Sequence, residues 1–158
     1  MHFLDFSPDG KLLRVNNAIH DAETGQKIFD LKTANFTDFD VSGRILATRS
    51  TASEKGQRIS LLRLSSDGNN EETMLDDLGG HWRSTALSSD GTLFATAAVP
   101  LGHGAVAIQV WDLQSRKLRK RLNGHWESIA TLAFSADGTK LASVGQTGHI
   151  IKIWSLEE

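Results

Sequence analysis

A tight turn that occurs four times is the feature of this sequence that most limits how the chain can fold. Each turn begins with Phe or Leu and ends four residues later with Gly, at residues 6–10, 39–43, 87–91 and 134–138. The closing glycine can adopt a positive φ angle, which suits a tight connection between two antiparallel strands. The four glycines lie 33, 48 and 47 residues apart. We therefore expect four similar β-rich units in sequence order.

Each unit continues beyond this first hairpin. A third segment alternates between apolar and polar residues, and a more polar fourth segment follows in the first three units, which indicates strands with one buried face. The third segments lie at 18–21, 59–64, 108–113 and 151–156, and the fourth at 27–31, 73–78 and 117–122. The predicted units are 1–32, 33–78, 79–122 and 123–158, with long loops at 49–58 and 98–105. The expected fold is all-β, built from antiparallel sheets of up to four strands. In the first unit Asn16-Asn17 should close the second hairpin, because Asn tolerates the left-handed conformation.

Composition narrows the class of protein further. The chain has 158 residues, a formal net charge of −2 and no cysteine. This length suits one domain, and the lack of cysteine excludes disulfides and thiolate metal sites. A nearly neutral chain is not expected to bind nucleic acid or anionic lipid through charge alone. No signal-peptide pattern and no apolar run of membrane-spanning length are present, so we expect a cytoplasmic protein without membrane contact.

The third and fourth units carry further marks. Gly124-His125 precedes the first strand of the fourth unit, and Trp154 ends the third strand of that unit. The third unit contains Trp111-Asp112. With these marks the chain resembles the WD-repeat β-propeller family, best in the fourth unit, next in the third, and only weakly in the first two. The resemblance implies propeller blades of four-stranded sheets. It also implies a rigid scaffold for protein–protein contacts that has no catalysis of its own.

The resemblance implies a hydrogen-bonded network within a blade, made by His, Ser or Thr, Asp and Trp. His125, Ser143 and Trp154 match it in the fourth unit, but no Asp stands at 146–148. Thr96 and Trp111 are the expected structural residues of the third unit. Gly80-His81 lies 10 residues before Gly91, whereas His125 lies 13 before Gly138. We therefore expect an ungapped register that places Trp82 opposite Ile129.

Four blades are fewer than the seven that the family commonly has, and the fourth unit lacks an outer strand. Unpaired edges and uncovered apolar faces are costly in a repeat fold. Three arrangements satisfy them: the C-terminal part of a longer propeller, which we favour, two copies in an eight-bladed ring, or a stand-alone propeller. Self-association through the open terminal blades follows from the second arrangement.

The expected contact surface is the rim made by the loops between second and third strands and by the loops that enter each blade. Trp126 either is exposed on this rim, where it would be a natural interface anchor, or folds over the edge of the blade. The candidate partner-binding residues are Arg49, Lys55, His103, Trp126, Glu127, Gln146 and His149. The partners are expected to be other proteins, of unknown identity.

No chemistry-bearing motif accompanies this pattern. The six histidines lack close metal-ligand spacing, no Gly-x-Ser-x-Gly elbow occurs, and Gly102-His103-Gly104 lacks the lysine of a phosphate loop. We expect no catalytic residue, no cofactor and no metal. The basic segment 116–121 indicates a solvated outer strand, and binding of nucleic acid there is the weaker alternative. An accessory domain of a larger enzyme or signalling protein is the other alternative.

Overall fold

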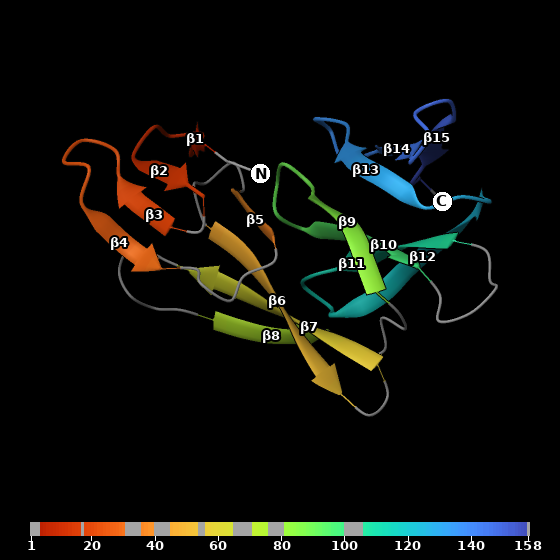
Figure 1. Cartoon of the computed structure of the whole chain (residues 1–158), viewed down its shortest axis with the longest axis horizontal. Coiled ribbons are helices and arrows are strands. Elements are labelled where there is room, and N and C mark those ends of the chain that lie inside the picture. The colour runs from red at the N-terminus through yellow and green to blue at the C-terminus, as the bar shows by residue number, and fades with distance from the viewer. Residues whose placement is uncertain are drawn as a thin grey trace. The chain divides into compact units, whose positions relative to one another are not determined.

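The computed structural model describes residues 4–16, 18–30, 36–39, 45–53, 56–64, 71–75, 81–99 and 106–157, with side chains at 4–16, 18–30, 84–97 and 106–157. Every regular element in these residues is a β-strand (Figure 1). No helix suited to crossing a membrane is found in that part of the chain. The all-β fold predicted from the turns is confirmed.

The strands form four antiparallel sheets, numbered here in chain order, and each sheet joins strands that are consecutive in the sequence. Sheet 1 contains β1 (Leu4–Phe6), β2 (Leu12–Val15), β3 (Ala18–Asp21) and β4 (Lys27–Asp30). Sheet 2 contains β5 (Phe36–Phe39), β6 (Ile45–Ser53), β7 (Gly56–Leu64) and β8 (Glu71–Leu75). Sheet 3 contains β9 (His81–Leu87), β10 (Leu93–Val99), β11 (Val106–Asp112) and β12 (Lys117–His125). Sheet 4 contains β13 (Ile129–Phe134), β14 (Lys140–Gly145) and β15 (Ile151–Ser155).

The main departures from the strand boundaries expected from the sequence lie in sheets 2 and 3. The long loop expected at 49–58 is mostly strand, because β6 and β7 extend towards each other. The last strand of sheet 3 was expected to end at 122, but β12 continues to His125, which pairs with Val106. Alternation in these segments is weak, so backbone pairing rather than side-chain pattern decides where the strands end.

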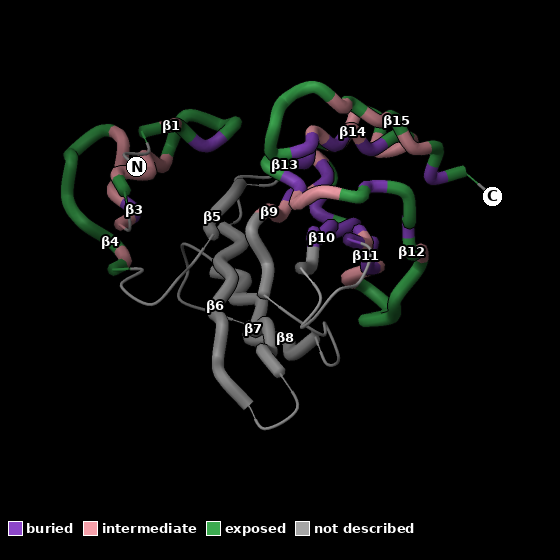
Figure 2. The backbone as a smooth tube through the Cα atoms, turned by 45° about the vertical axis from the view of Figure 1, so that its right-hand side comes forward, coloured by how far each residue is buried: buried purple, intermediate pink, exposed green. Residues whose placement is uncertain are grey.

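The chain divides into two compact units, Met1–Thr51 with Arg58–Leu75, and Ala52–Gln57 with Asp76–Glu158. In the second unit the apolar side chains of sheets 3 and 4 form one core, seen as the buried stretches of β10, β11 and β14 in Figure 2. Twelve buried residues belong to it, namely Ala86, Leu93, Ala95, Ala97, Val106, Ile108, Val110, Leu122, Ile129, Leu132, Leu141 and Leu156.

The repeated turn has the same hydrogen bonds in sheets 1, 3 and 4. In sheet 4, Ser135 Oγ donates to Asp137 Oδ1 over 2.6 Å, and the Lys140 amide donates to Ser135 Oγ over 2.9 Å. Equivalent bonds run from Ser7 to Asp9 and from Ser88 to Asp90. The closing glycines have φ angles of 70–71°. The side chains therefore fix the turn and the register of the hairpin that follows it.

Asn16 also has the positive φ angle expected of it, at 53°. It follows β2 and precedes β3, so the short second hairpin of sheet 1 closes as the sequence indicates. Asn17 lies outside the described residues.

We predict that Gly138→Ala lowers the free energy of unfolding by about 1 kcal/mol, because a Cβ is unfavourable at positive φ. The added Cβ itself would meet no atom within 4 Å, so the cost is one of backbone conformation. Urea denaturation measures the change. Gly138→Asn is the control and should cost less, since Asn tolerates this conformation. Equal losses for Ala and Asn would contradict the explanation.

Candidate functional site

Ser143 forms hydrogen bonds with two other side chains, those of His125 and Trp154. Its Oγ lies 2.8 Å from His125 Nε2 and accepts a hydrogen bond of 2.8 Å from Trp154 Nε1. Ser143 and His125 are 0% and 2% exposed. His125 comes from the end of β12, Ser143 from β14 and Trp154 from β15, so the network links the outer strand of sheet 3 to sheet 4.

The corresponding positions of sheet 3 do not form this network. Thr96 pairs with Gln109 in the same register in which Ser143 pairs with Lys152, and Trp111 stands where Trp154 does. Among the described residues, Thr96 Oγ1 and Trp111 Nε1 are both buried without a hydrogen-bond partner. Thr96 and Trp111 are therefore buried in sheet 3, but in the described residues they do not form the hydrogen-bonded network expected of them. The residue at the His125 position, Leu78, lies outside the described residues.

The pairing register of β9 with β10 also fixes the position of Trp82 in sheet 3. It pairs with Ala98 just beyond a bulge in β9, as Ile129 pairs with Gly145 just beyond a bulge in sheet 4. This is the ungapped register expected from the spacing of Gly80-His81.

The network of sheet 4 is open on one side, as the missing Asp predicts. His125 Nδ1 is buried and has no hydrogen-bond partner in the described part of the chain. Nearby, the Glu127 carboxylate accepts hydrogen bonds of 3.1 Å from the Thr147 amide and from Thr147 Oγ1. It occupies the space that a Cβ at Gly145 would need, so any other residue there would require the Glu127 side chain to move. A carboxylate is thus present at this turn, but it holds the turn rather than the histidine.

The pairing of a histidine with a serine is not that of a nucleophile and its base. Ser143 Oγ is fully buried and accepts the Trp154 N–H, so a substrate cannot reach it. Within the described ranges, no group of three or more His, Asp or Glu residues could hold a metal ion. The geometry supports a structural role for His125, Ser143 and Trp154.

We predict that Ser143→Ala lowers the free energy of unfolding by about 1–3 kcal/mol, because it removes the hydrogen-bond partner of the half-buried Trp154 Nε1 and of the buried His125 Nε2. Chemical denaturation followed by tryptophan fluorescence measures the change. Ser155→Ala is the matched control, an exposed serine on β15 that should change stability by less than about 0.5 kcal/mol. If both substitutions changed the free energy of unfolding equally, the network would not be a source of stability.

The pKa of His125 is lowered, first by burial and then by the charge of Lys152, while Glu127 opposes the shift. A histidine whose folded-state pKa lies below its unfolded value stabilises the fold fully above about pH 6.5, and that stabilisation is lost as the pH falls towards the folded-state pKa.

We therefore predict that the stability difference between the wild type and His125→Asn shrinks as the pH falls from 7.5 to 5.5. Taking the difference cancels the titration of other groups. Thermal unfolding of both proteins across this range measures it. A difference that stays constant would show that protonation of His125 is not linked to folding.

Trp126 stands at the rim of sheet 4 and is 76% exposed. Two rim segments are tied together beside it, because the Gln146 amide donates to the Ser128 carbonyl over 2.7 Å and Glu127 bonds Thr147. A large aromatic side chain is therefore presented by a backbone that is already ordered. Such a side chain loses little entropy on binding.

The other candidate partner-binding residues are placed less completely. Gln146 and His149 are exposed on the turn between β14 and β15, on the same rim as Trp126. Arg49 lies within β6 rather than in a loop, and its side chain is not described. Lys55 and His103 lie outside the described residues. Glu127 is half-buried and is engaged with Thr147, so it supports the rim more than it offers a free contact.

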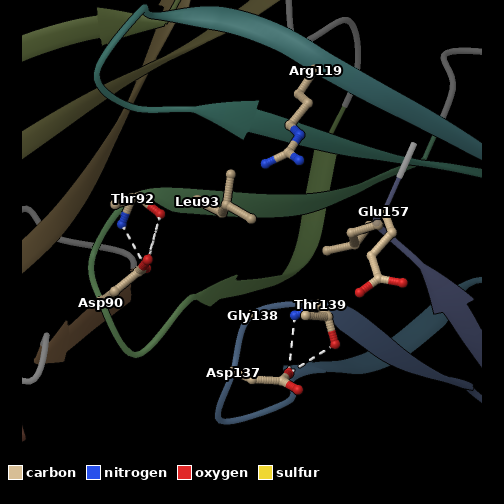
Figure 3. A pocket seen from close by; sticks show the side chains of 9 residues that line it. Asp90, Thr92, Leu93, Arg119, Asp137, Gly138, Thr139 and Glu157 are labelled. Carbon is tan, nitrogen blue, oxygen red and sulfur yellow. Dashed lines mark hydrogen bonds between the residues drawn. The ribbon is translucent and has the colours of Figure 1, made fainter.

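A small cavity of about 210 Å³ lies where sheets 3 and 4 meet at their repeated turns (Figure 3). Its charged lining residues are Asp90, Arg119, Asp137 and Glu157. The Asp137 carboxylate accepts hydrogen bonds within its own turn. These bonds, from the hydroxyl of Ser135 and from the amide and hydroxyl of Thr139, lower the pKa of Asp137 to about 2. Small-molecule sites have volumes of roughly 300–1,000 Å³. The cavity is therefore better explained as a polar seam between two sheets.

Two basic side chains of strand β12 lie at this boundary between sheets 3 and 4. The register shifts between Val110 and Trp111, which makes Arg119 the extra residue of a bulge, and Arg119 lines the cavity. Lys120 Nζ donates to the carbonyls of Ser155 and Glu157, over 3.3 and 2.9 Å. Two of the five cations thus serve contacts between sheets 3 and 4, so the strand does not display an unbroken basic surface.

Comparison with known proteins agrees with this architecture. Residues 116–155 match the family model described as WD domain, G-beta repeat. The match begins with the outer strand of sheet 3 and continues through the three strands of sheet 4. The resemblance of the sequence to WD-repeat propellers is thereby confirmed.

Two solved structures and one curated relative illustrate the similarity. The Cps50 (Swd1) β-propeller domain of Myceliophteria thermophila superposes with a TM-score of 0.72 and 19% identity, covering 98% of this chain and 54% of that one. Kluyveromyces lactis Hsv2 gives 0.76 and 18%, covering 99% and 49%. Coronin-7 of Mus musculus is 42% identical over 45 residues, which are 28% of this chain and 5% of the relative. The sheets are thus those of a partial propeller, and the chain spans about half of each solved structure.

Proposed function

We propose that this chain, which carries a WD40 repeat at residues 116–155, is a non-catalytic scaffold that binds other proteins through the rim of sheet 4. The observation that carries the proposal is Trp126, which is 76% exposed on a rim where two backbone segments are hydrogen-bonded to each other. Tryptophan side chains are highly buried on average in folded proteins, and tryptophan is enriched among the residues that dominate binding energy.

The surroundings of Trp126 fit a protein partner better than a small ligand. Gln146 and His149 supply polar groups on the neighbouring turn, and both are exposed. A large aromatic residue at the centre with polar groups around it is the usual anatomy of a protein–protein interface. The WD-repeat match supports the same class of function, since rigid propeller loops present contact residues at low entropic cost.

The test compares partner capture by matched variants. Immobilised wild type, Trp126→Ala and Leu118→Ala are exposed to an extract of the source organism, and the retained proteins are measured by quantitative mass spectrometry. Leu118 is the control because it is also apolar and exposed, at 40%, but lies on β12 away from the rim. We expect proteins that wild type and Leu118→Ala retain equally and that Trp126→Ala retains at least about 30-fold less, the loss expected for a binding hot spot.

Thermal unfolding checks that Trp126→Ala remains folded, as its exposure predicts. If a folded Trp126→Ala protein retains the same partners in the same amounts, this rim is not the binding surface.

A further inference from the structure

The sequence contains one Asn-Gly dipeptide, Asn123-Gly124, near the end of β12. It also contains four Asp-Gly dipeptides, at 9–10, 67–68, 90–91 and 137–138. In either dipeptide the glycine nitrogen can attack the side-chain carbonyl carbon of the preceding residue and close a five-membered succinimide ring. Glycine favours this attack because it has no Cβ in the way and its backbone rotates freely. The structure treats the two kinds of dipeptide differently.

In the three described Asp-Gly turns both reacting groups are engaged. The amide of each closing glycine donates to a serine carbonyl over 2.8–2.9 Å, and the hydroxyl of the same serine donates to the Asp carboxylate over 2.6–2.7 Å. These hydrogen bonds lower the pKa of Asp9, Asp90 and Asp137. The three side chains therefore stay ionised, and a carboxylate is a poor target for a nucleophile. The turns are thus protected from ring closure.

Asn123-Gly124 has neither form of protection. Asn123 is exposed, and its side-chain amide makes no hydrogen bond to any other residue in the described part of the chain. Val106 pairs with His125 and Ala107 with Asn123, so no residue of β11 lies opposite Gly124. Gly124 is therefore the extra residue of a bulge, where the ladder of hydrogen bonds is locally disrupted. The side-chain amide is also uncharged and can release ammonia.

Packing explains why a glycine follows Asn123. A Cβ at Gly124 would lie 3.2 Å from the Trp154 ring and 3.3 Å from Lys152 Nζ. Gly124 also has a φ angle of 149°, which residues with a side chain rarely adopt. The close approach of Trp154 thus requires the residue that makes the dipeptide reactive.

We infer that Asn123 is a site of spontaneous deamidation in the folded protein. The Gly124 nitrogen loses its proton to solvent base and forms a bond to Asn123 Cγ. The bond from Cγ to Nδ2 breaks, and ammonia leaves with a proton from the solvent. Water then adds to one of the two ring carbonyls and opens the succinimide, which yields aspartate or isoaspartate. The net reaction consumes one water and releases one ammonia, so it needs no oxidant and no cofactor.

The two products differ in their effect on the fold. Residue 123 lies between Leu122, which belongs to the core and is 8% exposed, and His125, which is 2% exposed and bonded to Ser143 over 2.8 Å. Isoaspartate carries the main chain through Cγ and so adds one methylene between these two fixed points. The added length must displace one of them. Aspartate keeps the length of the main chain and adds only an exposed charge.

The first test follows the reaction in the intact chain. Folded protein and protein in urea are incubated at mildly alkaline pH and digested with trypsin, and peptide 122–140 is followed by mass spectrometry. This peptide contains Asn123 and no other Asn or Gln, so any conversion of an amide to an acid is assigned to it. We expect the folded protein to deamidate within about tenfold of the rate in urea, a barrier raised by less than about 1.4 kcal/mol. Asn123→Gln should abolish the mass change, because glutamine would need a larger ring.

Asp137-Gly138 lies in the same peptide and is the internal control. We expect its isomerisation to isoaspartate, measured by fragmentation of the peptide, to be much slower in the folded protein than in urea. The inference is wrong if Asn123 deamidates more than about tenfold faster in urea than in the fold. It is also wrong if folded Asp137 isomerises as fast as Asn123 deamidates, since the structural contrast would then have no effect.

The second test measures the consequence for stability. The isoaspartate form is separated from aged protein by chromatography, and Asn123→Asp supplies the aspartate form. We expect thermal unfolding to show a lower melting temperature for the isoaspartate form, and an Asn123→Asp protein close to the unmodified one. Equal melting temperatures for the two acidic forms would contradict the effect assigned to the added methylene. Neither test depends on the proposed scaffold function.

Discussion

The Ser-x-Asp-Gly turn is the interaction on which the rest of the described structure depends. Its serine accepts a backbone amide five residues later in each of sheets 1, 3 and 4, over 2.8–2.9 Å. A hairpin held this way has one register, and a slip of one residue would move every side chain to the other face. The same turn therefore decides which residues form the core between sheets 3 and 4 and which form the faces left uncovered.

The His125–Ser143–Trp154 network adds a second constraint, because it links β12 of sheet 3 to sheet 4. Among the residues that the structure describes, His125 Nδ1 has no hydrogen-bond partner, and the neighbouring Glu127 carboxylate is bonded to the rim turn instead. A polar network of this kind is costly to break and specifies one arrangement of strands. His125 directly precedes Trp126 in the sequence, so the network anchors the segment that carries this exposed side chain.

Trp126 lies on a rim, where side chains from turns meet solvent, and the proposed scaffold function rests on this surface.

The all-β architecture, the succession of antiparallel sheets and the ungapped position of Trp82 could all be predicted from the sequence, since turns and spacing are local properties. The ends of β6, β7 and β12 could not, because backbone pairing rather than side-chain pattern sets them. The engagement of Glu127 with Thr147 also needed tertiary structure, since the two residues are brought together by the β13–β14 hairpin. Alternation by itself shows that a strand has an apolar face. Only the packed sheets decide that Ala95 and Val110 are covered while Ile153 is not, because burial depends on the presence of a neighbouring sheet.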